Sequence, residues 1–176
     1  MNTPPSAERV WDPFVRVFHW SLVSTVVLNQ WVLEEGEGPH RWLGYAAAVL
    51  VLLRVVWGFI GPRYARFSDF WPTPTRLRHH LRAWFRGDEM HVPGHNPLGA
   101  LMMLALMLLV LLLALTGWLQ GTDRFWGNEA LRDAHESLAD GLIGLAGLHA
   151  AAALVMGRLE RTRLIKAMVT GVKERY

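Results

Sequence analysis

LMMLALMLLVLLLAL, the stretch at residues 101–115, decides the fold of this chain. It contains no ionisable side chain and sits inside a longer apolar segment, residues 97–119. A helix rises about 1.5 Å per residue, so about 20 residues cross a hydrocarbon core of about 30 Å. Soluble proteins rarely bury a helix this long and this apolar. The segment therefore predicts a transmembrane helix.

Three further segments have a similar length, residues 14–33, 42–60 and 137–156. They are less uniformly apolar, because they are interrupted by Arg16, His19, Arg54, Asp140 and His149. We predict an all-α integral membrane four-helix bundle, with residues 1–176 as a single domain. The polar start of the chain lacks a cleavable signal pattern, so the first span is expected to act as a signal-anchor.

The only long connection, residues 61–96, contains an expected amphipathic helix at residues 74–86. Its apolar positions are Leu77, Leu81, Trp84 and Phe85, opposite Arg76, His79, His80 and Arg82. We expect this helix to lie in the cytoplasmic headgroup layer. Asn96 before Pro97 is typical of a helix start. The histidines of the loop are expected to be solvated, namely His79, His80, His91 and His95.

Basic residues are distributed unevenly around the spans. Of the 18 lysines and arginines, 14 flank the spans on the side of both termini and the long loop, and three lie on the opposite side. The positive-inside rule then puts both termini in the cytoplasm. The charges flank spans and form no groove-sized patch, so they indicate anionic lipid and not nucleic acid as the partner.

Cysteine is absent from the sequence. This excludes disulfides, iron–sulfur ligation by this chain, thiolate zinc sites and covalent attachment of haem through a Cys-x-x-Cys-His motif. Any haem would be held by coordination and packing alone.

Four histidines lie within or at the edges of the spans, where an ionisable residue favours a functional role. His135 and His149 are 14 residues apart, about 21 Å along a helix and within about 40° of the same side. His40 begins its span at the level of His135, and His19 lies about one and a half turns into its span, near the level of His149. The spacing therefore predicts two facing pairs, His40 with His135 and His19 with His149.

Two imidazoles without a carboxylate or thiolate make a poor zinc site. They suit a macrocycle that supplies four equatorial nitrogens and needs two axial ligands. We predict two non-covalent haem b groups with these histidines as axial ligands to iron, and no catalytic residue of the chain.

Other residues of the spans support this interpretation or leave alternatives open. Arg54 lies 14 residues after His40 and is expected to bind a propionate of the inner haem; the alternative is that it snorkels to the cytoplasmic surface. The glycines Gly141, Gly144 and Gly147 could admit a porphyrin, or they could serve helix packing alone. Methionines of the third span are possible ligands, but are more often filler; these are Met102, Met103 and Met107.

The sequence also resembles a known family. HESLAD at residues 135–140 and GLHAAAAL at residues 147–154 resemble the fourth span of bacterial cytochrome b561. VWDPFVRVFHW at residues 10–20 and HRWLGY at residues 40–45 resemble its earlier segments. The middle of the chain is closer to the b-type cytochrome subunit of nickel–iron hydrogenases, in the segments RVVWGF (54–59), ARF (65–67) and GHNPLG (94–99).

The resemblance implies a four-span dihaem fold, with the four span histidines at the positions of the family's axial ligands. It also implies electron transfer in the bacterial inner membrane, as part of a respiratory chain. The outer haem level would serve a periplasmic redox partner, such as a c-type cytochrome or a dehydrogenase or hydrogenase subunit. The inner level would serve quinone. The chain is thus expected to be an electron-transfer cytochrome, a subunit or partner of a quinone-linked oxidoreductase.

Two alternatives belong to other functional classes. One is a stand-alone superoxide:quinone oxidoreductase. Some superoxide-oxidising members begin their third span with extra histidines, whereas only His95 precedes Pro97 here, which favours the hydrogenase-type branch. The other is a non-redox membrane scaffold or cation carrier, in which the histidines serve packing or proton relay.

Overall fold

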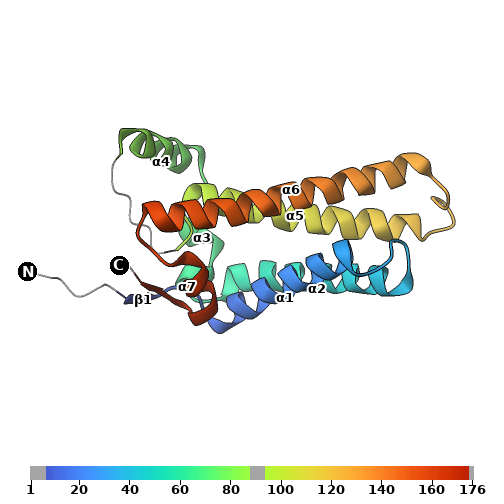
Figure 1. Ribbon diagram of the computed structural model, residues 1–176, viewed down its shortest axis with the longest axis horizontal. Coiled ribbons are helices and arrows are strands. Elements are labelled where there is room, and N and C mark those ends of the chain that lie inside the picture. The colour runs from blue at the N-terminus through green and yellow to red at the C-terminus, as the bar shows by residue number, and fades with distance from the viewer. Residues whose placement is uncertain (1–6, 88–93, 175–176) are drawn as a thin grey trace, which may run out of the picture. The chain divides into compact units, whose positions relative to one another are not determined.

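The computed structural model describes residues 7–87 and 94–174, most of them helical (Figure 1). The long helices are α1 (Pro13–Trp31), α2 (Gly38–Ile60), α5 (Pro97–Gln120) and α6 (Glu129–Leu159). Shorter ones are η1 (Arg63–Ala65), α3 (Phe67–Phe70), α4 (Pro74–Arg86) and α7 (Leu164–Thr170). The predicted all-α fold is confirmed, with the addition of one pair of short strands, β1 (Ala7–Arg9) and β2 (Val172–Glu174).

Several helices begin at a side chain that accepts a hydrogen bond from the first turn. Asn96 Oδ1 accepts from the amide of Gly99 at 2.7 Å, which confirms the helix start predicted at Asn96-Pro97. Asp12, Thr73 and Asn128 do the same for α1, α4 and α6. In α1, α4 and α5 the capping residue is followed by proline, whose missing amide hydrogen costs nothing at that position.

Three of the long helices, α2, α5 and α6, are long and apolar enough to cross a membrane. α1, expected as the first span, is not among them; it has 19 residues and includes Arg16 and His19. Large apolar side chains are exposed along the apolar helices, for example Leu108 at 56% and Leu115 at 48% on one face of α5. Exposed apolar surface of this kind is typical of a helix that contacts lipid.

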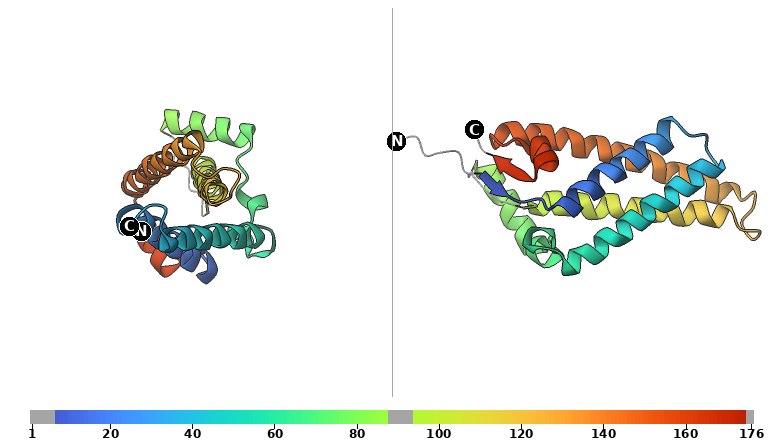
Figure 2. Two further views of the ribbon diagram at one scale, coloured as in Figure 1. Left: turned by 90° about the vertical axis from the view of Figure 1, so that its right-hand side faces the viewer. Right: turned by 90° about the horizontal axis from the view of Figure 1, so that it is seen from below.

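The residues cluster into two compact units, and all four long helices contribute to both. Unit 1 comprises Met1–Arg16, Trp57–Met103 and Leu148–Tyr176, and unit 2 comprises Val17–Val56 and Leu104–Gly147. Within unit 2, short turns join α1 to α2 and α5 to α6, so each pair forms an antiparallel hairpin, as its short connection predicts (Figure 2).

Unit 1 joins the two ends of the described chain. β1 pairs antiparallel with β2, with Ala7 opposite Glu174 and Arg9 opposite Val172 (Figure 1). Beyond the strands, the carbonyl of Gly171 accepts hydrogen bonds from the amides of both Val10 and Trp11, at 2.9 and 3.1 Å. Val10 and Trp11 also belong to an apolar core with Val15, Ala65 and Ala167, against which Trp57, Tyr64 and Met168 pack.

Two loop histidines depart from the expectation that they are solvated. His80 on α4 is buried, at 7% exposure, whereas Phe85 on the same helix is 83% exposed. His95 is half-buried, with its ring centroid 4.7 Å from those of both Trp11 and Phe70. The prediction was therefore wrong for these two residues, because an imidazole ring can pack against apolar and aromatic neighbours. His79 is exposed as predicted, and His91 lies outside the described residues.

The three glycines of α6 serve no packing contact within the described chain. A methyl group added at Gly141, Gly144 or Gly147 would meet no described atom within 4 Å. At about 100° per residue, the three positions fan out over the side of α6 opposite His135. Neither the packing nor the porphyrin interpretation of these glycines gains support from the described contacts.

Candidate functional site: two facing histidines

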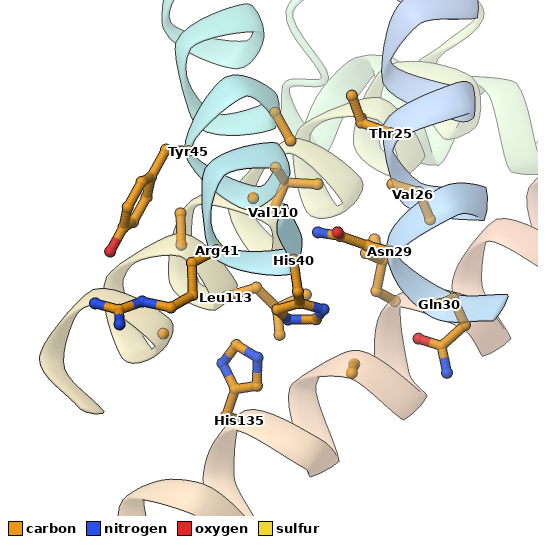
Figure 3. A pocket seen from close by; sticks show the side chains of 16 residues that line it. Thr25, Val26, Asn29, Gln30, His40, Arg41, Tyr45, Val110, Leu113 and His135 are labelled. Carbon is orange, nitrogen blue, oxygen red and sulfur yellow. The ribbon is translucent and has the colours of Figure 1, made fainter. Parts of the chain in front are cut away.

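The structure brings His40 and His135 together in unit 2. His40 lies on the first turn of α2 and His135 on the second turn of α6. Their ring centroids are 6.4 Å apart, and the planes are inclined by 61°. Figure 3 shows the two imidazoles directed toward one another. The turns that join α1 to α2 and α5 to α6 hold both helix ends in this unit.

The end of α5 holds the ring of His135. Thr116 Oγ1 lies 2.7 Å from His135 Nδ1, and the same hydroxyl lies 2.9 Å from the carbonyl of Leu112, one turn earlier on α5. At the next residue, Gly117, an added Cβ would lie 3.3 Å from His135 Cε1. The small residue therefore lets the ring pack against the α5 backbone.

The ring of His40 has a different environment. Its Nδ1 is buried, and among the described residues it has no hydrogen-bond partner. Asn29 Oδ1, on α1, is likewise buried without a hydrogen-bond partner among the described residues. His40 and Asn29 line one cavity together with His135 (Figure 3). A buried polar atom without a partner costs about 1–3 kcal/mol. Such atoms beside a cavity indicate that a ligand belongs there.

The cavity between the histidines has a volume of about 100 Å³ and a largely apolar lining. A second cavity of about 580 Å³ shares His40, His135, Asn29 and Arg41 with it and extends to the turn after α5. That volume is in the range of cofactor pockets, about 300–1,000 Å³.

The spacing of the rings fits a metal ion with one imidazole on each side. Metal–nitrogen bonds to histidine are about 2.0–2.1 Å, and each nitrogen is about 1.1 Å from its ring centre, so the centres would be about 6.3 Å apart. The observed separation is 6.4 Å. Among residues 7–87 and 94–174, no cluster of three or more His, Asp or Glu side chains could hold a metal ion. Two imidazoles alone suit haem iron, because its porphyrin supplies the other ligands.

The other two predicted ligands fall in different units. His19 lies on α1 in unit 2, half-buried, with its ring 5.1 Å from that of Trp20. His149 lies on α6 in unit 1 and is also half-buried. α6 runs without a break through both His135 and His149, as the predicted spacing along one helix requires.

Among residues 7–87 and 94–174, Arg54 has one of the two largest fully buried side chains, with 1% of its surface exposed. A snorkelling arginine would expose its guanidinium, so this burial argues against that alternative. Met107 on α5 is buried, at 5% exposure.

Sequence reasoning missed Thr116 and Asn29 as parts of this site. Both are polar side chains within apolar helices, and that is the signal which could have identified them. Neither residue type is a haem ligand, so attention to the histidines alone passed over them.

A sequence profile described as prokaryotic cytochrome b561 matches residues 10–171. The chain belongs to the prokaryotic cytochrome b561 family. Cytochromes b561 are membrane proteins that bind b-type haem and carry electrons across the membrane. No curated protein and no solved structure matches the chain.

Proposed function

We propose that this cytochrome b561 carries electrons between a periplasmic redox partner and the quinone pool, by means of two non-covalent b-type haems. The observation that carries the proposal is the facing of the His40 and His135 imidazoles, with ring centroids 6.4 Å apart. Haem supplies reversible one-electron chemistry when it is bound. The residues of the chain supply ligation, orientation and a surrounding from which water is excluded.

His40 and His135 would be the axial ligands of the outer haem. Their position beside the turns after α1 and α5 would make this haem accessible to a soluble partner in the periplasm. That partner would be a c-type cytochrome or a dehydrogenase or hydrogenase subunit, as the hydrogenase-like middle segments suggest.

His19 and His149 would be the ligands of the inner haem, on the basis of their sequence spacing. The buried guanidinium of Arg54 would bind one of its propionates, because its planar fork can bind a carboxylate in a bidentate manner. This level would exchange electrons with quinone at the cytoplasmic side of the inner membrane.

The test is to purify the chain and measure its haem. A pyridine haemochrome assay of acid–acetone extracts should give two haem b per chain, and a quinol analogue should reduce the oxidised protein. One haem per chain, or haem retained covalently, contradicts the two-haem proposal. A protein without haem absorption would instead be a scaffold or carrier.

A second measurement separates the proposal from the superoxide alternative. Superoxide and quinone are added without any protein partner, and quinol formation is followed. We expect no turnover, because this chain lacks the extra histidines before Pro97. Sustained turnover would identify a self-sufficient enzyme.

A further inference from the structure

Thr116 makes a hydrogen bond with His135, and the proposed function gives this bond no role. Its Oγ1 lies 2.7 Å from His135 Nδ1, and 2.9 and 3.1 Å from the carbonyl oxygens of Leu112 and Leu113. A hydroxyl has one hydrogen and two lone pairs. The carbonyls can only accept, so a hydroxyl that donates to one of them keeps its oxygen available to accept from His135 Nδ1–H.

This arrangement decides which nitrogen of His135 carries the proton. With hydrogen on Nδ1, Nε2 keeps its lone pair and is the nitrogen able to bind a metal. Histidines that bind metals commonly donate their other N–H to a fixed acceptor, which orients the ring and raises its basicity. The carbonyls of α5 fix the hydroxyl, and the hydroxyl then fixes the imidazole.

We propose that Thr116 is a positioning residue, which holds His135 with the Nε2 lone pair available for the iron of the outer haem. The inference rests on the proposed function, since it concerns a ligand of that haem. The close approach of Gly117 to His135 Cε1 supports it, because the ring then has a fixed seat on α5 as well as a fixed proton.

The central variant is Thr116→Val, which keeps the shape of the side chain and removes the hydroxyl. Loss of an outer-shell hydrogen bond typically weakens metal binding 10–100-fold. We expect the outer haem to dissociate about 10–100-fold more readily, as measured by transfer to an excess of apomyoglobin. Its reduction potential should become more positive, because a less basic imidazole stabilises oxidised iron less. Thr116→Ser keeps the hydroxyl and should restore both values.

Thr122→Val is the matched control. The hydroxyl of Thr122 also donates to a carbonyl of α5, that of Leu119 at 2.6 Å, and not to a histidine. Potential and haem retention should stay at wild-type values in this variant. A general loosening of the α5 end would affect both threonines, whereas ligand positioning affects only Thr116.

The outcomes separate this inference from the proposed function. Wild-type protein with two haems, and Thr116→Val with unchanged potentials and retention, would overturn the role of Thr116 and leave the proposed function intact. Equal losses in Thr116→Val and Thr116→Ser would also overturn it, because the hydroxyl would then be irrelevant. Wild-type protein without an outer haem would overturn the proposed function itself.

Discussion

His40 and His135 are held in different ways. His135 has a threonine and the backbone of α5 beside it, whereas the Nδ1 of His40 has no partner among the described residues. A haem shared by the two would need both, because one axial imidazole alone leaves the iron with an open position. Removing either one should therefore have the same consequence.

We predict that His40→Ala and His135→Ala lose the same haem, and that His19→Ala and His149→Ala lose the other. Redox titration of the four variants should give two pairs of matching curves, each with one couple left. His79→Ala is the control, since His79 is exposed on α4 and should leave both couples in place. Crossed behaviour, with His19 and His135 matching, would contradict the pairing.

Arg54 lies within the sequence of α2, and its charged side chain is buried, with 1% of its surface exposed. We predict that Arg54→Leu retains the fold but lowers the potential or the occupancy of the inner haem, because loss of a nearby positive charge favours oxidised iron. The outer haem should hardly respond, since the two histidine levels are about 21 Å apart along α6. Spectroelectrochemical titration measures both couples.

Arg54→Lys is a useful companion to that variant. It keeps the charge and loses the planar fork that binds carboxylates in a bidentate manner. We expect a smaller shift than in Arg54→Leu. Wild-type potentials and occupancies in both variants would show that Arg54 does not bind a propionate.

At the scale of elements, α4 shows how burial can give a helix a dependence on pH. Burial lowers the pKa of His80 below its usual 6.5, and the neighbouring His79 lowers it further, while Glu160 acts in the opposite direction. The unfolded chain then binds a proton more readily than the folded one, so stability falls as pH falls through 6.5 toward the lowered pKa. We predict that α4 opens more often at about pH 5 than at about pH 7.

Amide hydrogen exchange of residues 74–86, corrected for intrinsic rates, measures this opening. His80→Gln should remove most of the pH dependence, because the buried side chain then has no proton to gain. His79→Gln should keep it, since His79 is exposed. Equal pH dependence in the wild type and in His80→Gln would mean that another group is responsible.

Most long elements could be predicted from the sequence, because hydropathy and capping residues are local signals. α5 begins at Pro97 as predicted, and α4 covers the predicted residues 74–86. α6 extends from Glu129 to Leu159, well beyond the apolar residues 137–156, because hydropathy detects only its apolar part. The start of the helix after Asn128 was missed for the same reason, although the side chain of Asn128 caps it.

The parts that could not be predicted depend on partners distant in the chain. β1 and β2 have three residues each, and the partners are more than 160 residues apart, so neither leaves a periodic signal. The burial of His80 and the bond between Thr116 and His135 likewise arise from packing between elements. The pairing of His40 with His135 could be predicted, because the depth of each residue in the membrane follows from its position along its helix.

At the scale of the whole molecule, the charge distribution predicts an orientation. The lack of native cysteine makes it directly testable, because an introduced cysteine is then the only thiol. We predict that Glu37→Cys, between α1 and α2, reacts with an impermeant maleimide in intact spheroplasts. Thr75→Cys, on α4, should react only after the membrane is opened.

Both positions are exposed in the structure, so a missing reaction reports the side of the membrane and not burial. Lysed membranes provide the control, in which both variants should be labelled. The reverse pattern in spheroplasts would invert the proposed orientation and move the outer haem site to the cytoplasm.

The junction of β1 with β2 also has a consequence for the order of events during synthesis. The amides of Val10 and Trp11 cannot make their hydrogen bonds until Gly171 has been synthesised. A ribosome adds roughly 5–20 residues per second, so the first-made segment stays open for roughly ten to thirty seconds. The helices can enter the membrane in that time, but unit 1 cannot close. Residues around Gly171 therefore complete the packing around Val10 and Trp11 only after the four long helices have been made.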